Sequence, residues 1–529
     1  MSYDYIVVGA GSAGCVLANR LSADPTKRVL LLEAGPSDRN PWIHVPLGYG
    51  KTISNPAVNW CFESQPEEYC YGQQFFLPRG KVLGGTSAIN GMVYVRGQVE
   101  DFDGWAQQGC RGWSYDDVLP YFLKCETNSR GADAMHGGDG PLQVSDVGEQ
   151  TVICKAMLAA GQQIGIPWND DLNGRVQEGI GWHQATISKG RRNSTAVAYL
   201  KPIRKRPNLD VRTNALVRRV LFEGKRATGI EYDRDGSTQV AHAGGAVILS
   251  GGAFGSPHLL ELSGIGDPQR LKDLGIPVLH ALPGVGANLQ DHFVAHVRWR
   301  VKNARTFNDR THGLRALVEG LNYIVRRKGV LTQPTLPIGA FIRTRPELAS
   351  PDVQLQIFTA TYPALRARTL DAKPGVTIGA AVLRLEGRGH VHAQSSDPAV
   401  QPAIWHNLLA TDNDRRTVVE GMRVARRLMD APAMKPHFDF EMMPGAEVQS
   451  DDELLDYARR NGRSNMHPAG TCKMGIDERA VVDPTLKVHG LDSLYVADAS
   501  IMPNVVSGNT NAGTIMIGEK AADLILAAA

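Results

Sequence analysis

The sequence lacks any apolar run of the ~18–20 residues that a membrane-spanning helix needs. Its N-terminus also lacks a basic segment followed by an apolar stretch and a cleavage site, so we expect a cytoplasmic protein without a secretory signal. The formal net charge is only +3, from 57 basic and 54 acidic residues, which argues against a nucleic-acid partner. The low charge, with apolar residues along the whole length, argues against disorder.

Cysteine is scarce and irregularly placed. The seven cysteines lie far apart and form no C-x-x-C pair, which argues against a disulfide framework, a structural zinc site and a thioredoxin-like centre. No metal site is therefore predicted. Of the 529 residues 43% are hydrophobic and 21% charged, as in ordinary globular proteins, and the length predicts two or three domains.

The beginning of the chain has the pattern strand, glycine turn, helix and second strand. A short apolar run at 5–8 precedes the turn GAGSAG at 9–14, and a helical segment then leads to VLLLEAG at 29–35. This pattern is the G-x-G-x-x-G fingerprint of dinucleotide-binding folds, with the acid Glu33 about 20 residues after the last glycine. The fingerprint alone leaves FAD and NAD open.

Each position of the fingerprint has a physical role. Gly9 permits the tight turn, Gly11 lets the backbone approach a pyrophosphate, and Gly14 lets the helix pack closely on the sheet. The start of the helix, at Ser12 and Ala13, offers free N–H groups to phosphates. The carboxylate of Glu33 can accept hydrogen bonds from a ribose diol and would repel a 2′-phosphate, which disfavours NADP.

Five further motifs are spread along the chain. They are PRGKVLGGTSAINGMVYVRGQVEDFD (78–103), GAFGSPHLLELSGIG (252–266), PGVGANLQDH (283–292), HPAGTCKMG (467–475) and VADASIMP (496–503), with GNTNAGTIMIG following at 508–518. Together they resemble the glucose-methanol-choline (GMC) family of flavoprotein oxidoreductases, in the family's order and from end to end. VYVRG and NTNAGTIMI resemble the choline-dehydrogenase-like and bacterial alcohol dehydrogenase branch.

The resemblance implies a mixed α/β fold with two domains. A discontinuous Rossmann-like FAD-binding domain would comprise 1–155, 195–300 and 455–529. A smaller substrate-binding domain with an antiparallel sheet would comprise 156–194 and 301–454. Residues 208–233 alternate as strands of a meander do, and 246–257 look like a buried strand that enters a glycine turn.

The resemblance also implies the catalytic pair. Alcohol oxidation requires a group that accepts the hydroxyl proton, and an imidazole suits this because its pKa lies near neutral pH. His467 stands where the family carries its catalytic histidine, and Asn511 where it carries a second histidine or asparagine that orients the substrate oxygen. Asn509 is the nearest alternative. His292 is interpreted as structural or close to the cofactor.

Further cofactor contacts are carried over from the family. Non-covalent FAD is expected, because Ile89 stands where some members link FAD through a histidine. Beside the fingerprint residues and Glu33, the expected FAD contacts are Ala34, Arg79, Gly84, Gly85, Asn90, Gly91, Val93, Val217, Asp498, Ala499, Asn511 and Thr514.

The segment QPTLPIGAFIRT (333–344) resembles one that lines the substrate pocket of relatives, and it indicates Ile338 and Phe341 as pocket residues. Choline-type and several alcohol-type relatives carry a glutamate nearby, which is absent here, so a neutral primary alcohol is favoured over a quaternary ammonium. A quinone-like electron acceptor is favoured over O2.

Several alternatives remain open from the sequence. They are a choline-type dehydrogenase, a hydroxynitrile lyase of the same fold, a non-catalytic FAD module and an NAD-dependent dehydrogenase. Basic clusters at 189–192, 204–206, 326–327 and 459–460 are interpreted as solvated surface, the alternative being peripheral contact with an anionic membrane at its inner face. The sequence carries no signal for the oligomeric state.

Overall fold

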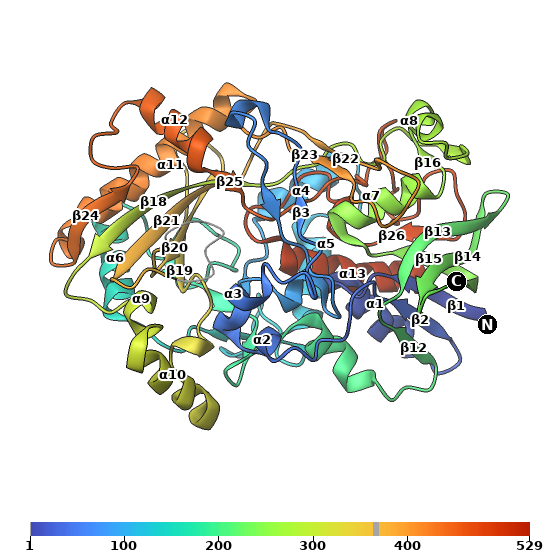
Figure 1. Cartoon of the computed structure of the whole chain (residues 1–529), viewed down its shortest axis with the longest axis horizontal. Coiled ribbons are helices and arrows are strands. Elements are labelled where there is room, and N and C mark those ends of the chain that lie inside the picture. Colours follow the sequence, from blue (N-terminus) through green and yellow to red (C-terminus); the bar gives the residue numbers. More distant parts are fainter. Residues whose placement is uncertain (1, 363–369, 529) are drawn as a thin grey trace.

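Two large sheets organise the computed structural model, which describes residues 2–362 and 370–528 (Figure 1). Within these residues each large sheet has seven strands. The first sheet, at the right of Figure 1, contains the N-terminal strand. It consists of β1 (Ser2–Val8), β2 (Val29–Leu32), β12 (Leu209–Arg212), β13 (Leu216–Glu223), β14 (Arg226–Arg234), β15 (Ser237–Leu249) and β26 (Leu494–Val496).

The first sheet is parallel at its centre and antiparallel at one edge. β12, β2, β1, β15 and β26 run parallel, whereas β13, β14 and β15 pair antiparallel. All four residues of β2 are buried and apolar, as is typical of a parallel strand. The expected meander over 208–233 is therefore only partly present, because β12 pairs with β2 instead of β13.

Helices continue from the ends of these parallel strands. α1 (Ser12–Leu21) begins directly after the fingerprint turn, and α7 (Gly252–Leu262) follows β15. The C-terminal helix α13 (Thr510–Ala527) packs on α1. A Cβ at Gly518 would lie 3.0 Å from the Ala13 carbonyl oxygen, so a glycine suits this close approach. The two ends of the chain thus meet beside the fingerprint.

The second sheet is antiparallel, and its order is β24, β18, β21, β20, β19, β8, with β25 also paired to β18. Helices α6, α11 and α12 pack against its strands or against one another. Its strands and these helices are β8 (Gly179–Trp182), β18 (Phe293–Val301), β19 (Ile338–Ile342), β20 (Val353–Phe358), β21 (Gly375–Val382), β24 (Phe438–Met443), β25 (Arg463–Ser464), α6 (Val152–Gln163), α11 (Asp412–Asp430) and α12 (Asp451–Asn461).

The expected domain boundaries remain predictions. Strands β18 and β25 of the second sheet come from segments that the sequence analysis assigned to the FAD domain.

The other helices are α2 (Pro41–His44), α3 (Tyr49–Thr52), α4 (Val99–Gln107), α5 (Tyr115–Cys125), α8 (Pro268–Asp273), α9 (Phe307–Arg310) and α10 (Gly313–Arg326). In the part of the chain that the structure describes, no helix combines the length and hydropathy of a membrane span.

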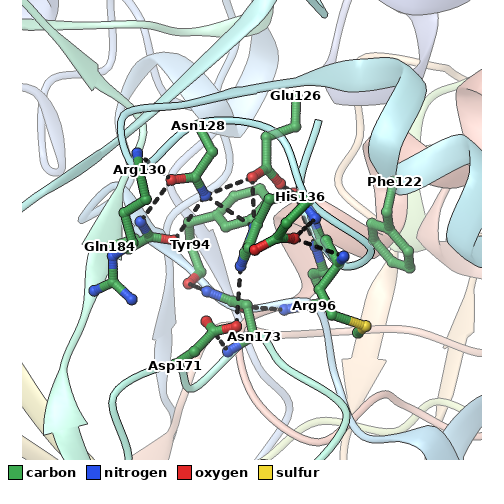
Figure 2. A network of polar contacts seen from close by, with 12 residues as sticks. Tyr94, Arg96, Phe122, Glu126, Asn128, Arg130, His136, Asp171, Asn173 and Gln184 are labelled. Atoms are coloured by element: carbon green, nitrogen blue, oxygen red, sulfur yellow. Dashed lines mark hydrogen bonds and ion pairs between the residues drawn. The ribbon is translucent and has the colours of Figure 1, made fainter. Parts of the chain in front are cut away.

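A buried polar network lies beside a smaller sheet made of β5 (Val93–Tyr94), β9 (Gln184–Ala185), β7 (Leu142–Asp146) and β6 (Glu126–Asn128). Figure 2 shows its side chains converging on Glu126. One carboxylate oxygen of Glu126 accepts hydrogen bonds from the Tyr94 hydroxyl, at 2.8 Å, and from the Arg96 guanidinium. The other lies 2.8 Å from Nδ1 of His136, whose Nε2 lies 2.9 Å from Asp171. We call these five residues the Glu126 network.

Candidate active site

A cavity of about 1230 Å³ lies between the two large sheets. Its volume exceeds the ~300–1,000 Å³ of most small-molecule pockets, so it suits a large ligand together with a second molecule. On one side it is bordered by the last residues of the parallel strands β1, β2 and β15, which is where doubly wound sheets bind nucleotides. On the other side it is bordered by side chains of the second sheet, namely His296, Gln356, Phe358 and Thr377.

The fingerprint turn forms the floor of this cavity. Gly9 has φ +100°, and a Cβ there would lie 2.4 Å from the Ser250 carbonyl oxygen. A Cβ at Gly14 would lie 1.8 Å from the Gly9 oxygen, so Gly14 permits helix packing and does not itself line the cavity. Gly11 lines the cavity and is open on that side. Each glycine therefore meets the requirement predicted from the sequence.

Glu33 ends the second strand with its carboxylate at the cavity wall. Its two oxygens accept hydrogen bonds from the backbone N–H groups of Ala10, at 3.0 Å, and Gly35, at 2.9 Å. Burial raises the pKa of the Glu33 carboxyl to about 7, although these two hydrogen bonds oppose the rise. The acid is thus anchored to the fingerprint turn itself.

A second glycine-rich loop closes over the fingerprint. The Gly84 N–H donates to the Ala10 oxygen at 2.8 Å, and a Cβ at Gly85 would lie 2.6 Å from the Gly11 Cα. Gly84 itself does not line the cavity among the described residues. The other predicted cofactor residues do, and they are Ser12, Ala13, Ala34, Arg79, Gly85, Asn90, Gly91, Val93, Val217, Asp498, Ala499, Asn511 and Thr514.

His467 lines the cavity and contacts three other side chains through its two ring nitrogens. Its Nε2 lies 2.9 Å from Nδ2 of Asn509, and its Nδ1 lies 3.0 Å from Nδ1 of His292 and 3.3 Å from Nδ2 of Asn465. Its backbone N–H donates to Asp291 at 2.7 Å, and the Ser464 hydroxyl bonds the other oxygen of the same carboxylate. The main chain at His467 is therefore held by an acid that does not touch the imidazole ring.

These contacts define the state of the His467 imidazole. Asn509 Nδ2 and Asn465 Nδ2 can only donate, so each ring nitrogen of His467 faces an amide N–H group, and Nε2 accepts from Asn509. Enclosure by protein lowers the pKa of His467 well below its usual 6.5, and the positive charge of Arg79 and repulsion from any protonated His292 lower it further. His467 is therefore a neutral imidazole with the lone pair of Nε2 beside Asn509.

Asn509 occupies the place that the sequence analysis gave to Asn511. Asn511 lies in the first turn of α13, where its Oδ1 accepts a hydrogen bond from the Ser12 hydroxyl at 2.7 Å. Successive helical residues are rotated by about 100°, so residues two apart face different sides. Asn509 precedes the helix and reaches His467, and its Oδ1 is buried without a hydrogen-bond partner among the described residues. In this structure His467 therefore contacts Asn509 and not Asn511, and the catalytic role of Asn511 stays a prediction.

The two predicted substrate-pocket residues do not border the cavity. Ile338 and Phe341 are fully buried in β19, where they pack into two hydrophobic clusters. The neighbouring Thr335 and Leu336 border it instead. Sequence reasoning also underrated His292, which touches the catalytic candidate, although the NLQDH motif had drawn attention to it.

Comparisons with known proteins agree with this geometry. Residues 3–294 match the N-terminal part, and residues 386–518 the C-terminal part, of the GMC oxidoreductase family. The chain is 44% identical to an alcohol dehydrogenase [acceptor] from Pseudomonas putida, over 99% of this chain and 96% of that protein. It is 43% identical to the mitochondrial choline dehydrogenase of Homo sapiens, over 99% and 89%. The chain is a GMC oxidoreductase.

Solved structures of relatives have the same fold. Pyridoxine 4-oxidase from Mesorbium loti superposes with a TM-score of 0.89 at 29% identity and covers 98% of each chain. A variant of formate oxidase from Aspergillus oryzae superposes with a TM-score of 0.92 at 26% identity, over 100% of this chain and 98% of that one. The expected mixed α/β fold with an antiparallel second sheet is confirmed.

FAD fits the residues that this GMC oxidoreductase presents. The family binds FAD and acts on CH–OH donors. The glycine turn at 9–14 leaves room that a Cβ would fill, and the N-terminus of α1 faces the cavity with Ser12 and Ala13. Glu33 would hold the ribose, and the orphaned Asn509 oxygen marks the reaction end of the same cavity.

Proposed function

We propose that this GMC oxidoreductase oxidises a neutral primary alcohol to an aldehyde, with His467 as the base and Asn509 orienting the substrate oxygen. Bound FAD supplies the hydride acceptor, at the flavin N5. Nε2 of His467 takes the hydroxyl proton, and the alcohol oxygen is held by the side-chain amide of Asn509. The observation that carries the proposal is the neutral imidazole bound to Asn509 at the wall of the fingerprint cavity.

A base must be unprotonated before it can accept a proton. The surroundings of His467 favour the unprotonated imidazole. No carboxylate of the described residues lies within ion-pair distance of its ring, whereas such a partner would favour the imidazolium. When the hydroxyl donates to Nε2, the neighbouring Nδ2 group of Asn509 can donate to the alcohol oxygen instead. The site is thus arranged to favour a hydroxyl group at this point.

A neutral substrate is favoured over choline because of where the acids lie. Four acids border the cavity among the described residues. Glu33 and Asp498 belong to the fingerprint side, Glu63 lies on β3 (Phe62–Glu63), and Glu319 is bound by Arg310. The second sheet contributes no acid, so a buried quaternary ammonium would lack a counter-charge there.

The FAD is proposed to be dissociable, and the electron acceptor to be quinone-like. Ile89 lies at the cavity wall where a covalent link would need a nucleophilic side chain. An isoleucine cannot form that bond. Relatives of this chain differ in their electron acceptor: they include an alcohol dehydrogenase [acceptor] and oxygen-dependent choline dehydrogenases.

Anaerobic mixing of the purified holoenzyme with single alcohols tests the proposal. Primary alcohols should bleach the flavin band near ~450 nm, whereas choline should bleach it slowly or not at all. Faster bleaching by choline would contradict the substrate class. A yellow protein that no alcohol reduces would favour a lyase or a non-catalytic FAD module.

Two further measurements test the cofactor link and the electron acceptor. Denaturation should release the flavin into the supernatant. The reduced flavin should be reoxidised faster by a quinone analogue than by O2.

A further inference from the structure

Helix α10 (Gly313–Arg326) turns its apolar side outward. An ordinary surface helix buries its apolar stripe and exposes its polar one. In α10, Tyr323 is the only buried residue, while large apolar side chains three or four positions apart are 63–81% exposed. They are Leu314, Leu317, Val318, Leu321, Ile324 and Val325, which we call the α10 face. Figure 1 shows α10 at the lower edge of the molecule.

A group of cations adjoins the C-terminal end of this face. Arg326, Arg327 and Lys328 are exposed at the end of α10. A Cβ at Gly190 would lie 2.7 Å from the Arg327 carbonyl oxygen, so the turn that carries the exposed Lys189 and Arg191 lies against the same end. No carboxylate of the described residues is within ion-pair distance of these five cations, which we call the basic cluster.

We propose that the α10 face and the basic cluster together dock this protein onto an anionic lipid bilayer. A helix with exposed leucine, isoleucine and valine flanked by cations is suited to lie at the bilayer surface, its apolar side among the acyl chains and its cations at anionic headgroups. A second copy of the chain is a poorer occupant, because the nearby acids Asp309 and Glu319 are already bound by Arg315 and Arg310 and cannot pair with the basic cluster.

The docking surface adjoins the cavity. The inward side of α10 contributes Ala316, Glu319 and Gly320 to the cavity wall, and the preceding His312 borders it as well. A bilayer in contact with the outer side of α10 would therefore lie one helix away from the substrate space. The docking itself does not depend on the proposed function, because binding can be read without turnover.

Cosedimentation of the holoenzyme with vesicles tests the proposal. Vesicles of phosphatidylcholine mixed with phosphatidylglycerol should carry the protein into the pellet, vesicles of phosphatidylcholine alone should carry much less, and added salt should release it. The double variant Leu317→Glu/Leu321→Glu should lose about tenfold or more in vesicle affinity. Arg326→Glu/Lys328→Glu should weaken binding only to the anionic vesicles.

Val176→Glu is the matched control, because Val176 is 69% exposed but lies outside the α10 face. It should bind vesicles as the wild type does, and flavin content and melting temperature should be unchanged in all variants. Wild-type protein that stays in the supernatant would overturn the proposal. Vesicle binding that is undiminished in the double leucine variant would also overturn it. A third contradicting result would be a dimer, seen by light scattering in the wild type and lost in this variant, when neither protein binds vesicles.

Discussion

Two histidines, His136 and His467, are enclosed by the same protein and reach opposite charge states. His136 sits between Glu126 and Asp171, and its pKa is raised to about 9 because the hydrogen bonds to these acids outweigh the effect of burial. His467 contacts two amides and another imidazole, and enclosure lowers its pKa well below the usual 6.5. Burial disfavours the charged form of both imidazoles, and only at His136 do neighbouring carboxylates outweigh it.

The two sites also differ in how completely their hydrogen bonds are made. In the Glu126 network both carboxylate oxygens and both imidazole nitrogens have partners (Figure 2). Around His467, Nε2 of His292 and Oδ1 of Asn509 are buried without partners among the described residues. A saturated network stabilises a fold, whereas an unsaturated one beside a cavity is prepared for a ligand.

The largest effect expected from this comparison is on catalysis. His467→Ala removes the base and should lower alcohol turnover by about 10²- to 10⁴-fold. The flavin content and the midpoint of unfolding should stay close to wild type, because the imidazole forms no ion pair among the described residues. Steady-state kinetics together with flavin absorbance per chain measure both quantities. Turnover near the wild-type value would remove His467 from its proposed role.

The Glu126 network should show the opposite result. Arg96→Met removes one of the two cations that contact the buried carboxylate of Glu126 and should lower the free energy of unfolding by about 3–5 kcal/mol. Turnover per folded, flavin-bearing molecule should be retained. Arg175→Met is the control, because the Arg175–Asp116 pair is exposed and should contribute little to stability. Equal losses in the two variants, measured by urea unfolding, would contradict this account.

The charge on His136 gives a pH dependence with a definite sign. Its folded pKa of about 9 lies above the usual 6.5, so its stabilising contribution is complete below pH 6.5 and is lost as the pH rises through 9. The free energy of unfolding should therefore fall by up to about 3 kcal/mol over this interval. His136→Gln should lack this fall. If the free energy of unfolding, measured in urea, changes with pH in the same way in both proteins, His136 is not charged in the folded state.

The smallest effect separates the two asparagines near His467. Asn509→Ala should lower kcat about 100-fold, as expected when one group that holds the reacting oxygen is removed. Asn511→Ala should change kcat less and should weaken FAD retention, because its side chain bonds Ser12 at the start of α1. If Asn511→Ala proves the more damaging to kcat, the pairing expected from the sequence is the functional one.

Much of the cofactor end could be predicted because its residues are local in sequence. The turn at 9–14 and Glu33 lie within one strand–helix–strand unit, where each glycine has a steric reason of its own. Most of the residues predicted to contact the cofactor line the cavity, although they make up a minority of its lining. Its remaining walls come from segments hundreds of residues apart, which only the folded chain brings together.

Expectation and structure differ where the spacing of residues alone cannot give the direction of a side chain. Asn509 and Asn511 are two residues apart across the start of α13, and the motif does not reveal which one the helix turns toward His467. Ile338 and Phe341 lie in β19, an interior strand whose five residues are all buried, so alternation carries no signal about which side faces the cavity. His292 reaches His467 only through a tertiary contact.

The most direct test of a neutral His467 is the pH dependence of anaerobic flavin reduction by a primary alcohol, followed by stopped flow. The account predicts a rate constant that stays level on the acid side to well below pH 6.5, because the imidazole is already unprotonated there. It also predicts a uniformly slow reduction in His467→Ala. A wild-type rate that falls as the pH is lowered through 7, with that fall absent in the variant, would contradict it.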